Sequence, residues 1–364
     1  MKRRSLLKWG GAGLSVAAAA PPSVRAQSMP AVKWRLASSF PKSSDTIYGG
    51  AEMIARRVAR ATEGAFQIRV FASGEIVPGL QVLDAVQNGT VACGHTASYY
   101  YVGKDPTFAF DTALPFGLNT RQQNAWMYHG GGLELMRELF SEYNVIQFPA
   151  GNTGAQMGGW FRKEIKSLDD LNGLKFRIGG WGGEVFARLG VVPQQIAGGD
   201  VYAALEKGTI DAAEWIGPYD DEKLGFHKVA KYYYYPGWWE GGPQLSAYVN
   251  LDQWHRLPPS YQSIFETACA EANSSMVAKY DAENPEALKR LVAGGALLRP
   301  FPREVLDAAY RAAFRLYDET AAGNLRFKKI YAAWRRFRAD DYLWFRVAEN
   351  PFDNFVYAKS AKQH

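Results

Sequence analysis

The sequence predicts an α/β protein with two similar lobes and a ligand cleft between them. Its 364 residues exceed what a single hydrophobic core usually holds. Residues 82–92 and 201–211 align without a gap, and each segment reads as a helix, a Gly-Thr pair and the start of a strand. A unit used twice favours two lobes, although this junction is also the commonest one in α/β proteins.

The first 26 residues predict an export signal. A twin-arginine start, Arg3-Arg4, precedes a weakly apolar Gly/Ala stretch and a small-residue cleavage site that ends at Ala26. Five of the six net positive charges of the chain lie in this leader, so the rest is nearly neutral and argues against a nucleic-acid partner. No later run is apolar enough to span a membrane. We therefore expect a periplasmic protein that is exported by its twin-arginine signal.

The chain pattern after the leader predicts interwoven lobes, because no linker rich in Pro or Ser separates them. We expect lobe I to comprise residues 27–150 with a return segment at about 217–253. We expect lobe II to comprise residues 151–216, continued by a helical region at about 254–364. The first lobe begins with a βαβαβ pattern: strand 32–38, helix 45–62, strand 66–71, a helix ending at Gly89 and strand 91–95.

The remaining elements follow from the same periodicity. The expected order is helix 121–143 broken at 130–132, strand 145–148, a bridging loop from 152, short helix 168–171, strand 174–178, a glycine loop at 179–183, helix 184–189, strand 193–196, helix 201–207 and strand 210–213. From residue 258 onward long helices are expected at 261–284, 303–320 and 325–338, with a strand-like break at 296–299.

Arg177 is the first candidate for ligand binding. It interrupts an apolar strand just before a glycine turn and a helix start. Its planar guanidinium can hold a carboxylate through two parallel hydrogen bonds, and a helix amino terminus also favours an anion. The alternative is a structural salt bridge, which is the role of most arginines.

Glu214 and Glu240 are candidates for binding a cation. Each acid ends a structured segment beside a tryptophan. With the amide of Gln156 they would form an all-oxygen set that suits a hard cation such as Na⁺ or Ca²⁺. Two carboxylates, one arginine and a monoanionic ligand leave a charge of about −2, which a cation would relieve in a desolvated site. Alone, each acid reads equally well as a solvated side chain.

Other chemistries lack their motifs. The chain has no P-loop, no Gly-x-Ser-x-Gly and no His-Glu-x-x-His, and its 5 His argue against zinc or histidine-base catalysis. Two Cys make neither a disulfide scaffold nor a metal site. The acidic run at 220–222 reads as a solvated helix start. An exported enzyme that uses the two glutamates as an acid–base pair remains a remote alternative.

Several blocks resemble the periplasmic solute-binding subunits of tripartite ATP-independent periplasmic (TRAP) transporters. They are Leu36-Ala-Ser-Ser-Phe-Pro, Gln156-Met-Gly-Gly-Trp-Phe-Arg, Gly173-Leu-Lys-Phe-Arg-Ile and Gly208-Thr-Ile-Asp-Ala-Ala-Glu-Trp. The blocks within residues 192–242 are similar to the branch that binds 2-oxo acids such as pyruvate. The resemblance covers essentially the whole mature chain.

The resemblance implies a two-lobed periplasmic binding protein of type II-like fold with long carboxy-terminal helices, and not an enzyme. Arg177 would hold the substrate carboxylate. A sodium ion, with calcium as the alternative, would be bound by Gln156, Glu214, Glu240 and the backbone carbonyl of Trp215. The expected partners are a 2-oxo acid, a membrane TRAP permease and a second copy of the chain.

Two further residues are expected in the pocket wall. Asn152 opens the bridging loop, and Tyr101 belongs to an aromatic segment, residues 99–101, at a strand end. A 2-hydroxy acid such as lactate, or a larger carboxylate, remains the alternative ligand. The sequence leaves open the preferred chain length and the state of Cys93 and Cys269.

Overall fold

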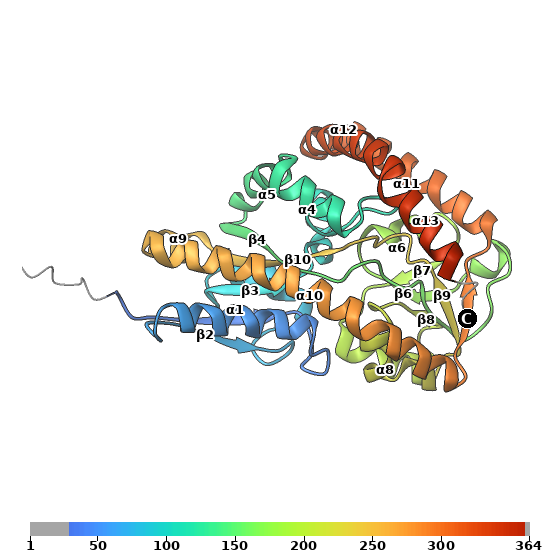
Figure 1. Cartoon of the computed structure of the whole chain (residues 1–364), viewed down its shortest axis with the longest axis horizontal. Coiled ribbons are helices and arrows are strands. Elements are labelled where there is room, and N and C mark those ends of the chain that lie inside the picture. Colours follow the sequence, from blue (N-terminus) through green and yellow to red (C-terminus); the bar gives the residue numbers. More distant parts are fainter. Residues whose placement is uncertain (1–28, 361–364) are drawn as a thin grey trace, which may run out of the picture.

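The computed structural model describes residues 29–360, which contain two β-sheets with helices packed around them (Figure 1). The expected signal peptide lies outside the described residues. The first sheet has the strand order β2-β1-β3-β10-β4, and the second has the order β11-β9-β5-β8-β6-β7. We call the elements around these sheets the first and the second lobe. The two-lobed α/β prediction is confirmed.

The first sheet follows from the alternating pattern of its strands. Its strands are β1 (Val32–Ser38), β2 (Phe66–Phe71), β3 (Cys93–Thr96), β4 (Val145–Asn152) and β10 (Gln244–Asn250). In β1, Trp34 and Leu36 are buried whereas Lys33 and Arg35 are exposed, as expected for a half-covered strand. Strand β10 runs antiparallel between β3 and β4, so the last strand to enter this sheet lies in its interior. This strand was not expected from the sequence.

Helices cover both faces of the first sheet. They are α1 (Ile47–Ala61), α2 (Val82–Gln87), α3 (Ala109–Thr112), α4 (Thr120–His129), α5 (Gly132–Ser141) and α9 (Leu251–His255). Helix α1 buries Ile47, Ala51, Ile54 and Val58, which recur at the spacing of one helix face. The expected break at residues 130–132 separates α4 from α5, and Gly131 there adopts a φ of 81°.

The second sheet is built from shorter strands. They are β5 (Gly159–Phe161), β6 (Lys175–Arg177), β7 (Val192–Gln194), β8 (Ala212–Ala213), β9 (Tyr232–Tyr235) and β11 (Leu297–Pro300). Its helices are α6 (Gly180–Ala187), α7 (Val201–Glu206) and α8 (Pro218–Leu224). Strand β6 pairs parallel with β8, which aligns Arg177 with Ala213 and brings the next residue, Glu214, to the same sheet edge.

Two of the segments in which the described chain crosses between the sheets lie side by side. Residues 153–158 lead from β4 to β5, and residues 236–243 lead from β9 back to β10. The Gln156 amide donates to the Glu240 carbonyl at 3.0 Å, and the Gly237 amide donates to the Gln156 carbonyl at 2.9 Å. The lobes are therefore interwoven, as expected, and the paired crossings form the junction between them.

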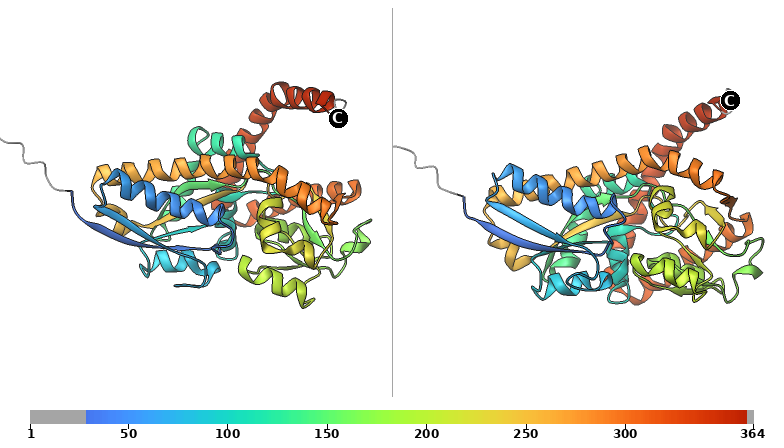
Figure 2. Two further views of the ribbon diagram at one scale, coloured as in Figure 1. Left: turned by 60° about the horizontal axis from the view of Figure 1, so that its bottom comes forward. Right: turned by 90° about the horizontal axis from the view of Figure 1, so that it is seen from below.

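Helix α10 (Pro259–Ala293) runs along both lobes (Figure 2). Its first half packs on α1 and β4, and its second half packs on α8. Buried residues such as Phe265, Ala272 and Tyr280 line one face of the helix. The helix continues through Pro285, so it extends beyond the expected end at residue 284. One continuous helix thus spans the junction.

The carboxy-terminal helices are α11 (Arg303–Gly323), α12 (Leu325–Val347) and α13 (Glu349–Ser360). Figure 2 shows that the end of α12 and α13 project from the body of the molecule. This projecting arm exposes Leu343, Trp344, Val347, Phe352 and Phe355, each by more than half of its surface. Helix α12 is longer than expected, and α13 was not expected.

The structure differs from the sequence prediction in four respects. Gly180, Gly182 and Gly183 lie within α6 rather than in a loop before it. The expected return segment 217–253 is divided, because β9 joins the second sheet and β10 joins the first. The helical region from residue 254 touches both lobes through α10 and α12.

The fourth difference concerns the acidic run, in which Asp220 and Asp221 are buried rather than solvated. Asp221 accepts hydrogen bonds from the Trp160 indole at 3.0 Å and the Tyr233 hydroxyl at 2.7 Å, and Asp220 accepts one from the Tyr280 hydroxyl at 2.9 Å. The run does begin a helix, α8, but its acids anchor that helix to the core.

Two further findings bear on the earlier expectations. Cys93 and Cys269 are both buried and free. Within residues 29–360, no helix combines the length and the apolar character that crossing a membrane requires.

Candidate ligand-binding site

Arg177 lies at the carboxyl end of β6 and is almost fully buried. Its Nε donates to the carbonyl oxygen of Ile196 at 3.0 Å. Its Nη1 donates to the carbonyl oxygen of Glu214 at 2.8 Å and also to Oε1 of the same residue. Its Nη2 finds no hydrogen-bond partner among the residues that the structure describes. The guanidinium is therefore held on two sides and has one nitrogen, Nη2 with its two N–H groups, left for a ligand.

The two glutamates approach the same point from different segments. Glu214 follows β8, and Glu240 lies on the second crossing. Both side chains are buried, and Oε1 of Glu214 also accepts from the Gly179 amide at 3.2 Å. Oε2 of Glu214 and Oε1 of Glu240 lack a donor within the described part of the chain. Buried carboxylate oxygens without donors are costly, so these two atoms indicate a missing positive or donating group.

Gln156 completes a ring of oxygen atoms on the first crossing. The terminal atom of its amide lies 2.7 Å from the carbonyl oxygen of Trp215 and 2.8 Å from Oε2 of Glu240. If that atom is nitrogen, it donates to both neighbours. If it is oxygen, three acceptors converge, and either a cation or a proton on Glu240 would stabilise them. The residues therefore fit a hard cation, which would be bound by an amide, a carbonyl and carboxylates.

Burial and mutual repulsion control the protonation of the glutamates. Burial, and then the charge of Glu214, raise the pKa of Glu240 well above its usual range. Burial also raises the pKa of Glu214, whereas Arg177 acts in the opposite direction. Burial acts to lower the pKa of Arg177, but the charge of Glu214, together with Tyr100, Tyr99 and Glu240, outweighs it and the net shift is upward. We place the anion on Glu214, which accepts from Arg177 and Gly179, and the proton on Glu240.

A small cavity adjoins these groups. Counting space open to solvent, its empty volume is about 290 Å³, of which only about 10 Å³ admits the centre of a water-sized sphere. Its polar wall contains Gln156, Trp215, Thr153, Tyr99 and Tyr100, and its apolar wall contains Phe40, Ile47, Ala97, Ile216 and Leu245. A compact carboxylate with a short apolar substituent matches this division of the walls.

Contacts between the lobes close the cavity. The ring of Tyr99, from the 3₁₀ helix 98–101 of the first lobe, packs directly on α6: a Cβ atom added at Gly179 or Gly180 would lie 2.7 or 2.9 Å from it. The Gln195 side chain donates to the Tyr100 carbonyl at 3.0 Å. Gly180 has a φ of 57°, which also favours glycine there. These contacts exclude water from the guanidinium and the carboxylates.

The structure brings together five of the seven predicted site residues, namely Arg177, Gln156, Glu214, Trp215 and Glu240. The other two, Tyr101 and Asn152, have their polar groups satisfied elsewhere. The Tyr101 hydroxyl contacts the Leu83 amide at 3.1 Å and Thr96 at 2.9 Å. The Asn152 side chain is bonded to Thr120, Gly154 and Gly242.

The neighbours of Tyr101, Tyr99 and Tyr100, line the cavity in its place. Sequence reasoning identified the aromatic segment, but which of its rings line the cavity depends on a 3₁₀ turn that has no clear sequence signal, and the role of Tyr101 in ligand binding stays a prediction. Phe40 and Thr153 were not predicted.

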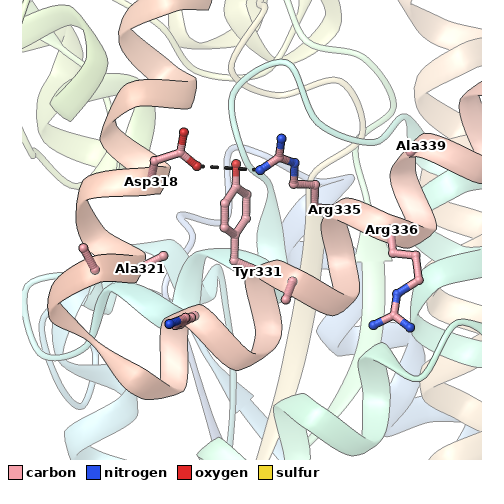
Figure 3. Close-up of a pocket in the computed structure, with 9 residues that line it drawn as sticks. Asp318, Ala321, Tyr331, Arg335, Arg336 and Ala339 are labelled. Carbon is pink, nitrogen blue, oxygen red and sulfur yellow. Dashed lines mark ion pairs between the residues drawn. The ribbon is translucent and has the colours of Figure 1, made fainter.

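A wider groove lies between α11 and α12 (Figure 3). The residues that line it are distant in sequence from Arg177. Counting its open mouth, it encloses about 1120 Å³. Alanines line it together with Lys328, Arg335 and Arg336, and Arg335 lies 3.9 Å from Asp318. The groove is open to solvent and offers a single carboxylate, so it does not share the chemistry of the buried site.

Comparison with known proteins identifies the relatives of this chain. Residues 37–324 match the family described as bacterial extracellular solute-binding protein, family 7. The monocarboxylate 2-oxoacid-binding periplasmic protein of Nostoc sp. is 57% identical over 328 residues, which are 90% of either chain.

Two solved structures are also similar along most of the chain. A TRAP transporter solute-binding protein from Bordetella bronchiseptica, a dimer with calcium and picolinate in one active site, is 56% identical with a TM-score of 0.91. It covers 92% of this chain and 100% of its own. A TRAP periplasmic solute-binding protein from Pseudoalteromonas atlantica, with bound sodium and pyruvate, is 38% identical with a TM-score of 0.86, covering 89% and 98%.

Proposed function

Because this chain belongs to the bacterial extracellular solute-binding proteins of family 7, we propose that it captures a small 2-oxo monocarboxylate, such as pyruvate, together with a cation. The observation that carries the proposal is the buried arginine with one unused donor beside two carboxylate oxygens that lack donors. The 2-oxoacid-binding relative in Nostoc sp. and the pyruvate complex of the Pseudoalteromonas protein support the same ligand class.

The roles of the site residues follow from their chemistry. Nη2 of Arg177 binds the ligand carboxylate. Gln156, Glu240 and the Trp215 carbonyl, with Glu214 beside them, hold the cation, which also contacts the ligand oxygens. Tyr99 and Tyr100 close the site from the first lobe. We propose sodium as the cation, because sodium accompanies pyruvate in the Pseudoalteromonas protein and the oxygen ligands of this site suit a hard cation.

Calcium with a different carboxylate is the second candidate. The Bordetella protein, at 56% identity, holds calcium and picolinate. Picolinate shares with a 2-oxo acid a carboxylate next to a second donor atom, so both can chelate a cation through adjacent atoms. A 2-hydroxy acid such as lactate has the same feature.

We further propose that the protein delivers its ligand to a TRAP membrane permease and catalyses no reaction. Twin-arginine export to the periplasm is part of the proposal. The two glutamates share one arginine, and Glu240 faces another acid, so their arrangement supports ion binding better than acid–base catalysis of a bound substrate.

The projecting arm supports a homodimer. Its exposed apolar residues, Leu343, Trp344, Val347, Phe352 and Phe355, form a surface that water disfavours. The dimer of the Bordetella protein supports the same assembly. A second copy of this chain is therefore the proposed partner of the arm.

The experiment that tests the ligand is a tryptophan-fluorescence titration of the mature protein with pyruvate. It is run in metal-depleted buffer, then with sodium, then with calcium, and lactate and longer 2-oxo acids follow as competitors. Saturable binding that strengthens with sodium supports the proposal. Binding that requires calcium supports the second candidate, and no response in any buffer refutes the 2-oxo acid assignment.

A further inference from the structure

A single carboxylate on the rim of the cleft contacts two lysines from other elements. Asp45 lies between β1 and α1 in the first lobe. Its Oδ1 forms an ion pair with Nζ of Lys223 on α8, and its Oδ2 lies 2.9 Å from Nζ of Lys279 on α10. The Tyr219 hydroxyl also lies 3.3 Å from Oδ2. Asp45 therefore joins the first lobe to a helix of the second lobe.

The lysines are held in place by rigid surroundings. Nζ of Lys223 lies 3.7 Å from the centre of the Tyr219 ring. The Tyr219 amide donates to the Asn284 side chain at 3.0 Å, which fastens α8 to α10. Burial acts to raise the pKa of Asp45, but its bonds to Lys223 and Lys279 outweigh this effect and the net shift is downward. The contact is thus a positioned ion pair rather than a free surface charge.

The two halves of this contact are continuous with the cavity walls. Phe40 and Ile47, which flank Asp45 in the chain, line the cavity from the first lobe. Trp215 and Ile216, which line it from the second lobe, directly precede α8. If the lobes separate, Asp45 moves away from Lys223 at the same time as the cavity opens.

We propose that Asp45, with Lys223 and Lys279, is a latch that holds the lobes closed over the ligand and sets its residence time. This proposal rests on the proposed function, because it assumes a ligand that binds between the lobes. Asp45 is a positioning residue, since it acts on the ligand only through closure. Its ion pairs are about half exposed, so their effect is screened and modest.

The test is stopped-flow fluorescence of the mature protein with pyruvate and the cation found by titration. Asp45→Asn is expected to raise the dissociation rate constant about two- to tenfold, with the association rate constant within about twofold. The difference is expected to shrink in choline chloride, which screens the pair without changing the sodium concentration. The charge swap Asp45→Lys with Lys223→Asp is expected to recover part of the lost residence time.

The matched control is Asp84→Asn. Asp84 forms an ion pair of 2.8 Å with Lys104, at similar exposure, but both residues belong to the first lobe. Asp45 also precedes the amino terminus of α1, so both variants are checked for an unchanged unfolding midpoint. Equal dissociation rate constants for Asp45→Asn and Asp84→Asn overturn the latch.

A failure of the proposed function is distinguishable. If the unsubstituted protein binds no 2-oxo acid with any cation, the proposed function is refuted. The latch proposal is then tested by measuring the distance between the lobes. Spin labels at Arg60→Cys and Lys207→Cys report this distance by pulsed electron paramagnetic resonance. The latch predicts longer distances in Asp45→Asn than in Asp84→Asn, and equal distributions overturn it.

Discussion

Replacement of Arg177 by lysine separates ligand binding from folding. Truncation to alanine would leave Glu214 as a buried anion without its partner, which typically costs about 3–5 kcal/mol of folding free energy. Lysine keeps the positive charge beside Glu214 but loses the planar guanidinium. It cannot donate to Ile196 and Glu214 and also present a second nitrogen to the ligand.

The expected loss of affinity follows from Nη2, the nitrogen of Arg177 that has no partner among the described residues. A hydrogen bond between charged groups contributes about 1.5–3 kcal/mol, so its loss is expected to raise the dissociation constant for pyruvate roughly ten- to hundredfold. The assay is the fluorescence titration at saturating cation. Arg188→Lys is the matched control, because Arg188 forms an exposed ion pair with Glu319 away from the cavity. Pyruvate binding by Arg177→Lys within about threefold of both the control and the unsubstituted protein would refute the carboxylate role.

Two further predictions concern stability and assembly. Burial raises the pKa of Asp221 from 3.8 to about 7, so the folded state holds an extra proton between these values and stability falls as pH rises through them. The shift corresponds to about 4 kcal/mol of unfolding free energy. The unfolding free energy from urea titrations between pH 4 and 8 should depend less steeply on pH in Asp221→Asn than in the unsubstituted protein. An equally steep dependence contradicts the raised pKa of Asp221. Removal of residues 343–364, which include all five exposed apolar residues named in the arm, is expected to give a monomer by light scattering with pyruvate affinity kept, whereas a persistent dimer places the interface elsewhere.

Sequence reasoning selected five residues that the structure brings together, because the positions of some of them depend on local signals. Arg177 ends β6 and Glu214 directly follows β8, and parallel pairing of these strands places their carboxyl ends together. It missed β10, because a strand that enters the sheet interior after a crossover depends on long-range pairing that no local pattern records. For the same reason it missed β9, whose residues lay within the expected return segment of lobe I but pair with β5 in the second sheet.

The acids at 220–221 and the tyrosines at 99–101 show a second limit. An Asp-Asp-Glu run after Gly-Pro is typical of a solvated helix start, but Trp160 and Tyr233, distant in sequence, supply the donors that allow Asp221 to be buried. The direction of each tyrosine depends on a 3₁₀ turn of four residues. Such outcomes are decided by tertiary contacts rather than by the local sequence.

The choice between sodium and calcium has a measurable consequence in protons. Glu214, Glu240, Arg177 and a monoanionic ligand together carry about −2 when both acids are ionised, and their burial disfavours any residual charge. Calcium neutralises this charge alone. Sodium leaves about −1, which a proton on Glu240 can offset, in line with its strongly raised pKa.

We therefore expect sodium-dependent binding to retain the Glu240 proton and calcium-dependent binding to release it. Calorimetric titration in two buffers of different ionisation enthalpy measures the number of protons released. The titration is run at a pH where Glu240 is protonated in the free protein. The number of protons released on binding is then expected to be near zero with sodium and to approach one with calcium. In Glu240→Gln it is expected to be zero with either cation. Equal proton release with the two cations would show that Glu240 does not adjust the charge of the closed site.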